Sequence, residues 1–225
     1  LGLFLITQFI GLYVVSQYNN PQDIPYGMAP QQEISFVSII ISFIIAITIM
    51  LILSKYKWKF LIRLWFFSVV VIALSIAFNV FLKDYVSYSY LWVLLLTIPL
   101  AYFKIYRPHF LTHNLTELFI YPGIGVVFVY LLDVKSIILF LIIISLYDAW
   151  AVWHSGIMQK MAKFQMNELN IFGGLLVPHT DKKTREKIKK LKQKYKGKKI
   201  PKSAKGIKIK MAMLGGGDII FPIIT

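Results

Sequence analysis

The sequence contains no cysteine and little charge for its length. The absence of cysteine excludes disulfide bonds, zinc sites built on cysteine and thiol nucleophiles. Only 16% of the 225 residues are charged, while 57% are apolar. A soluble domain needs more polar surface than this, because apolar atoms already cover much of any folded surface. The composition therefore excludes an ordinary soluble protein.

Acidic residues are scarce, and the positive charge is concentrated in one segment. The formal net charge is +15, and fifteen of the 25 Lys and Arg residues lie in residues 181–210. Because the surplus belongs to one loop, it does not indicate a nucleic-acid partner. We interpret the segment as a solvated loop whose residues Lys182–Lys210 can also contact anionic lipid headgroups.

Seven apolar stretches are long enough, or nearly so, to cross a membrane. A helix rises about 1.5 Å per residue, so about 20 residues cross the roughly 30 Å hydrocarbon core. Backbone groups inside lipid must be paired within the segment, which favours helices. The stretches are 1–18, 34–54, 60–82, 88–103, 115–132, 134–158 and 211–225.

These stretches predict an all-α polytopic membrane protein with three regions. Residues 1–158 hold six transmembrane helices, 159–210 form the basic loop, and 211–225 begin a seventh helix. Loops that would lie on one side of the membrane carry 23 Lys and Arg residues, against two on the other side. The positive-inside rule then predicts a cytoplasmic N-terminus and a cytoplasmic 159–210 loop, in a protein of the cell membrane.

Three acidic residues lie within apolar stretches: Glu117, Asp148 and Asp218. A carboxylate inside the membrane is costly, so it indicates a function by default. Glu117 is close to a basic loop, and we expect it to reach the cytoplasmic surface. Asp148 lies 13 residues beyond Lys135 and Asp218 lies seven beyond Met211. On antiparallel helices both would lie about 10 Å from the cytoplasmic side.

Two such carboxyl groups can hydrolyse a peptide bond without metal or thiol. One proton is shared between them, so one carboxylate activates water while the other carboxyl group protonates the carbonyl oxygen. Gly215, Gly216 and Gly217 precede Asp218, and they weaken the helix and admit another backbone. Close helix packing is the alternative interpretation of these glycines. Pro222 leaves the carbonyl of Asp218 without its helical donor.

Two short motifs resemble a known family. Tyr147-Asp148 is similar to the Tyr-Asp motif, and Gly215-Gly216-Gly217-Asp218 to the Gly-x-Gly-Asp motif, of presenilins and signal peptide peptidases. The chain looks most similar to archaeal members of these intramembrane aspartyl proteases. The resemblance implies Asp148 and Asp218 as catalytic residues, transmembrane peptides or proteins as substrates, and no cofactor or metal. The sequence is also compatible with a homo-oligomer.

The resemblance also implies a nine-helix fold. Family members carry a Pro-Ala-Leu motif in the ninth helix, and we expect this chain to stop within the seventh. In the family, short strands near the seventh helix pair with unwound substrate. Here Ile207 to Met211 alternates apolar and basic residues, and Leu175 to Pro178 is a short apolar run closed by proline. We therefore predict strands at both places, with Ile207 and Ile209 in the strand that binds substrate; a surface amphipathic loop is the alternative.

Two other interpretations remain at this point. His109, His113 and Glu117 share one helical face, with a spacing that a metal could use, but we favour an interfacial polar face and predict no metal site. Intramembrane carboxylates beside a glycine-rich break are also typical of proton-coupled transporters or channels.

Overall fold

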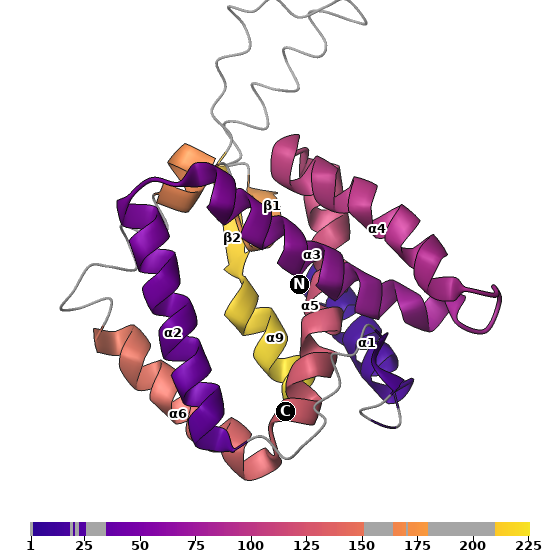
Figure 1. Cartoon of the computed structure of the whole chain (residues 1–225), viewed down its shortest axis with the longest axis horizontal. Helices are drawn as coiled ribbons and strands as arrows, with labels where there is room; N and C mark the ends of the chain where they lie inside the picture. The colour runs from indigo at the N-terminus through magenta and orange to yellow at the C-terminus, as the bar shows by residue number, and fades with distance from the viewer. Residues whose placement is uncertain are drawn as a thin grey trace, which may run out of the picture.

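The computed structural model describes residues 2–18, 20, 23–25, 35–150, 164–169, 171–179 and 210–225. Six helices come first, followed by a π-helical turn, two strands and a last helix (Figure 1). Their bounds are α1 Gly2–Ser16, α2 Phe36–Lys55, α3 Lys59–Leu82, α4 Ser89–Tyr106, α5 Phe110–Leu131, α6 Val134–Trp150, η4 Gln165–Leu169, β1 Gly174–His179, β2 Lys210–Gly215 and α9 Gly216–Ile224.

Four of the helices, α2 to α5, are long and apolar enough to cross a membrane. The 24 residues of α3 span about 36 Å, which exceeds the roughly 30 Å of hydrocarbon. Only 6% of the residues in the most apolar window of α2 are buried in the protein, as expected of a helix with a large surface open to lipid. The prediction of a polytopic helical membrane protein is confirmed.

One predicted helix start is wrong. Helix α5 begins at Phe110, ahead of its apolar stretch 115–132, as expected of a helix that carries His113 and Glu117 on one face, and His113 and Asn114 are buried inside the protein. The last helix begins at Gly216, whereas we expected one from Met211. Residues 210–215 form β2 instead, because their backbone pairs with β1, which lies more than thirty residues earlier. Of the predicted 134–158 stretch, residues 151–158 lie outside the described residues.

Helix α5 is the centre of the packing. Its apolar side chains contribute to each of the four buried clusters, with Ile120 against α3 and α4, Val126 against α1 and α3, and Tyr121 against β1 and α9. The remaining cluster joins α5 and α9 to α2 and α6, where the rings of Phe43 and Phe140 lie 5.0 Å apart. Helices α2 and α6 lie on one side of α9, opposite α5 and α1 (Figure 1), while Met50 and Leu53 of α2 pack against the cluster of α3, α4 and α5.

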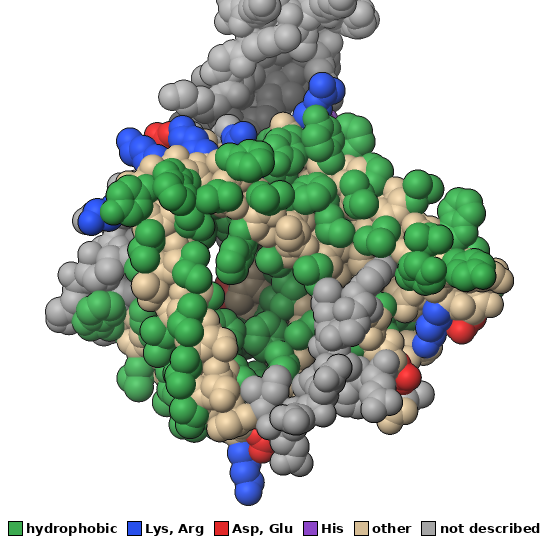
Figure 2. Space-filling model, viewed as in Figure 1, with side chains coloured by type: hydrophobic (Ala, Val, Ile, Leu, Met, Phe, Trp, Pro, Cys, Tyr) green, Lys and Arg blue, Asp and Glu red, His purple; other side chains and the backbone are tan. Residues whose placement is uncertain are grey.

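Strands β1 and β2 form an antiparallel pair at one end of the bundle. The register aligns Gly174 with Gly215 and His179 with Lys210. Gly174 has φ +144°, and a Cβ there would collide with the carbonyl oxygen of Leu214, so the position requires glycine. Lys and Arg side chains gather on the molecular end where the strands lie (Figure 2). Strand β2 continues directly into α9, so the sheet fixes where this helix enters the bundle.

Gly123 allows α5 to approach α3 closely, and its replacement gives a first prediction. A Cβ at this position would collide with the backbone carbonyl oxygen of Ala73, which cannot move alone. Gly123→Ala should therefore lower the free energy of unfolding by about 1–3 kcal/mol, measured by denaturation in detergent micelles. Gly2→Ala is the matched control, because no heavy atom lies within 4 Å of a Cβ there. Equal stability of the two variants would contradict the close packing.

Candidate active site

Asp218 lies in the first turn of α9, three residues after the end of β2. Gly215 is the N-cap, with φ −65° and ψ 150°, and the Asp218 side chain is solvent- or lipid-accessible. Its Oδ2 lies 3.5 Å from the position that a Cβ on Gly215 would occupy, so the carboxylate turns back toward the strand. The N-terminal end of a helix favours negative charge, because its first N–H groups lack helical partners.

One of the three glycines before Asp218, Gly216, is required by close packing against α5. A Cβ on Gly216 would lie 3.0 Å from both Cε1 and the hydroxyl oxygen of Tyr121, which is buried on α5. Only a glycine fits this approach without displacing the ring. Ile219 is buried on the other side of the turn, and the Nε2 of Gln8 on α1 donates to its carbonyl oxygen at 2.9 Å. The segment that carries Asp218 is therefore held between α1 and α5.

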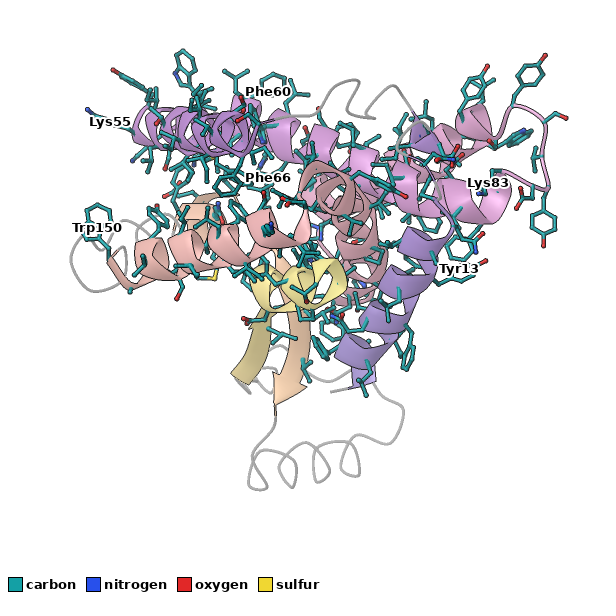
Figure 3. All side chains as sticks on the ribbon, turned by 90° about the horizontal axis from the view of Figure 1, so that it is seen from below. Tyr13, Lys55, Phe60, Phe66, Lys83 and Trp150 are labelled. Atoms are coloured by element: carbon teal, nitrogen blue, oxygen red, sulfur yellow. The ribbon has the colours of Figure 1, made fainter. Side chains whose placement is uncertain are left out.

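Asp148 lies in the last described turn of α6 and is half-buried. Its neighbour Tyr147 lines an apolar cavity of about 400 Å³ that α2, α3, α6 and η4 enclose. Trp150 lies at the outer end of α6, on the side away from α9 (Figure 3). Ile137 and Phe140, in the first half of α6, belong to the same buried cluster as Ile224 of α9.

A second apolar cavity, of about 200 Å³, reaches Gly217, the residue before Asp218. It is lined by residues of α2, α5, α6 and α9, among them Gly217, and Phe43 borders both cavities. The hollow between α2 and the helices opposite is visible in the space-filling view, where apolar side chains line it (Figure 2). Tyr147 and Gly217, the immediate neighbours of the two candidate aspartates, therefore line adjoining cavities. The structure does not bring Asp148 and Asp218 into contact, and their pairing stays a prediction.

The polar residues of α5 were predicted at the membrane surface, and this prediction is wrong. His113 and Glu117 are buried, and Glu117 is only 2% exposed. The Nζ of Lys104 on α4 lies 2.5 Å from Oε1 of Glu117, so the carboxylate finds an ammonium partner inside the protein and need not reach water. His109 is exposed and caps the helix, accepting from the Leu111 N–H. The three residues that we predicted to share one polar face therefore lie in different environments, with His109 exposed and His113 and Glu117 buried.

His113 and Asn114 hold β1 against α5. The Nζ of Lys104 lies 3.4 Å from Nδ1 of His113, and because an ammonium only donates, Nε2 carries the imidazole proton. Nε2 then donates to the carbonyl oxygen of Gly174 at 2.8 Å. The side-chain amide of Asn114 donates to Leu176 O at 2.8 Å and accepts from Leu176 N at 2.9 Å.

Sequence reasoning missed Asn114. The signal was present, because a run of polar residues within an otherwise apolar helix requires partners inside the protein. The partner strand lies about sixty residues later, and the spacing along the helix did not identify it.

Two contacts secure the turn that precedes β1. The exposed ion pair between Lys59 and Glu168 measures 2.6 Å, and Arg63 donates to the carbonyl oxygen of Leu169 at 3.3 Å. The hydrogen bond and positive charge of Lys59 lower the pKa of Glu168. These contacts join η4 to α3 and so direct the chain toward β1.

Fold and site together define a class of protein: a polytopic helical membrane protein with a carboxylate where a strand enters a helix, beside an apolar hollow. The chain belongs to the family described as signal-peptide peptidase, presenilin aspartyl protease, whose model matches residues 1–225. Comparisons with curated proteins and with solved structures gave no match. Membership of this family indicates intramembrane aspartyl protease activity on transmembrane substrates.

The buried ion pair between Lys104 and Glu117 gives a second prediction. Lys104→Met leaves the Glu117 carboxylate buried without its partner and should lower the free energy of unfolding by about 3–5 kcal/mol. The double variant Lys104→Met with Glu117→Leu removes both charges and should recover most of that loss. Denaturation in mixed micelles measures both. If the double variant were no more stable than Lys104→Met alone, the pair would not be coupled.

Proposed function

We propose that this chain is an intramembrane aspartyl endopeptidase in which Asp148 and Asp218 form the general acid and base. One observation carries the proposal. Asp218 lies three residues beyond Gly215, the last residue of β2. The outer edge of this strand has no backbone partner among the described residues. An extended peptide that paired with this edge would reach the carboxylate directly.

The strand register identifies the groups on that edge. In an antiparallel pair, each residue turns its N–H and C=O to the same side, and the side alternates along the strand. Leu176 turns both groups to Asn114, so its neighbours Leu175 and Val177 turn theirs toward β2. Their partners Leu214 and Ala212 face β1, so the N–H and C=O groups of residues 211 and 213 point outward, while the carbonyl of the N-cap Gly215 belongs to α9.

This outer edge supports substrate binding by strand addition. Main-chain hydrogen bonds hold an extended peptide with little dependence on its sequence. Gly215 ends the edge, and Asp218 lies in the following helical turn, about 5 Å further along the axis. Ile207 and Ile209, which we predicted to bind substrate, lie outside the described residues. Their odd numbers match 211 and 213, so a continued strand would extend the same edge.

The apolar hollow supports a transmembrane segment as the substrate. Side chains of α2, α6 and α9 line it, and the two cavities border Tyr147 on one side and Gly217 on the other. Apolar side chains of a segment arriving from the bilayer can occupy these cavities without desolvating charge, whereas a polar soluble peptide gains less. The proposed course runs from this hollow to the β2 edge, where the peptide is extended.

The proposed chemistry uses only the two carboxyl groups and water. The ionised carboxylate removes a proton from water as its oxygen attacks the peptide carbonyl carbon. The protonated carboxyl group gives its proton to the carbonyl oxygen, which forms a neutral tetrahedral diol. The C–N bond then breaks as the nitrogen takes a proton from the carboxyl group that gained one, and the diol returns its proton to the other. Both residues regain their starting states.

Replacement of either aspartate gives a third prediction. In the natural protein, Asp148→Ala and Asp218→Ala should each reduce cleavage of a model transmembrane peptide in liposomes by at least about a hundredfold. Asp133→Asn, which changes an exposed acid in the turn before α6, is the control and should keep full activity. Products are measured by mass spectrometry. Full activity in either alanine variant would refute the proposed dyad.

The outer edge of β2 gives a fourth prediction. Met213→Pro removes a backbone N–H that points outward. It breaks no hydrogen bond to β1, because the backbone N–H and C=O of Met213 point away from that strand. It should reduce cleavage about tenfold or more, since a hydrogen bond to the substrate strand is lost and the ring obstructs the edge. Met213→Ala keeps the N–H and should stay within about threefold of wild type. Equal activity of the proline and alanine variants would remove β2 as the substrate strand.

A further inference from the structure

The second edge of the sheet, on the outside of β1, is occupied at its centre by side chains of α5. The residues that face outward there are Gly174, Leu176 and Pro178, by the same alternation that orients β2. His113 donates to the carbonyl oxygen of Gly174, and Asn114 pairs with both backbone groups of Leu176. Pro178 has no N–H to offer.

Asn114 takes the position of a neighbouring strand on this edge. A primary amide carries one donor side and one acceptor side, which is the pattern that a backbone peptide group presents in a sheet. Asn114 is 7% exposed, and Leu176 is half-buried. The two hydrogen bonds, at 2.8 and 2.9 Å, are therefore largely shielded from water.

The neighbouring contacts fix the amide in place. His113 precedes Asn114 and is held between Lys104 on α4 and Gly174 on β1. Glu117, one turn further on, pairs with the same lysine. Helix α5 therefore presents a fixed polar surface to β1, whereas among the described residues β2 is paired on the edge that faces β1.

We propose that Asn114 is a positioning residue for proteolysis. By occupying the outer edge of β1, it leaves the outer edge of β2 as the free edge of the described sheet. It also fixes the position of β2, and thereby of the first turn of α9, which carries Asp218. This inference rests on the proposed function. Asn114 contacts the backbone of Leu176, so α5 would influence the unwinding of the substrate indirectly, by positioning the sheet. The helix thereby determines which strand receives the peptide.

The first test measures the contact without reference to activity. Asn114→Leu keeps a similar volume but removes donor and acceptor, so backbone amide exchange in residues 174–179 should increase about tenfold or more. Thr116→Val is the matched control: Thr116 is buried on the same helix, and its hydroxyl bonds only to the α5 carbonyl oxygens of Thr112 and His113. It should leave exchange in β1 unchanged. Unchanged exchange in Asn114→Leu would overturn the proposal.

The second test separates positioning from simple loss of stability. Two transmembrane peptides are compared, one with a stable helix at the cleavage site and one in which two adjacent residues there are replaced by glycine. Because strand pairing must offset the cost of unwinding, Asn114→Leu should reduce kcat/KM about tenfold or more for the first peptide and less than about threefold for the second. Thr116→Val should reduce neither. Equal losses for the two peptides would show a merely structural role and overturn the proposal.

The two tests also distinguish this inference from the proposed function. If the wild-type protein cleaves and Asp218→Ala does not, the proposed function stands, and activity of Asn114→Leu on the stable helix equal to wild type refutes the inference alone. If the wild-type protein cleaves neither peptide, the proposed function fails and the positioning role fails with it. Exchange in β1 then still reports on the contact between Asn114 and Leu176.

Discussion

The pairing of the Asn114 amide with the backbone of Leu176 is the contact on which the proposed site depends. A strand edge that is buried against a helix must find partners for its backbone groups there, because water cannot reach them. Here α5 satisfies one edge of β1, and β2 satisfies the other. The strand pair is therefore anchored to the most buried helix of the bundle, and α9 with Asp218 follows from it.

This arrangement connects a structural requirement with a chemical one. A peptide bond inside a helix is inaccessible to hydrolysis, because its carbonyl and N–H are enclosed by neighbouring turns. A free strand edge offers the hydrogen bonds that an unwound segment would otherwise lose in lipid. The edge ends at Gly215, where the turn bearing Asp218 begins, so binding and chemistry are adjacent along the chain. The apolar hollow between α2, α6 and α9 offers a route to that junction.

The sequence predicted the long helices well, because an apolar run of about 20 residues has few other folds in lipid. It predicted β1 as well, from a short run closed by Pro178. It failed at Met211–Gly215, whose apolar residues suit a helix equally, since only pairing with a distant strand makes them extended. It also misplaced Glu117, because nearness to a basic loop indicated the surface while Lys104 supplies a buried partner. Asn114 was missed for the same reason: its partner is tertiary.

Disulfide cross-linking tests the central claim most directly, and the absence of cysteine from these 225 residues gives it a clean background. Met213→Cys would be combined with Asp218→Ala, so that bound substrate stays intact, and single cysteines would be scanned along a transmembrane peptide. Strand pairing with β2 predicts cross-links at alternate peptide positions just before the cleavage site, since side chains in a strand alternate between two faces. Cross-links at every third or fourth position, or none at all, would contradict the account.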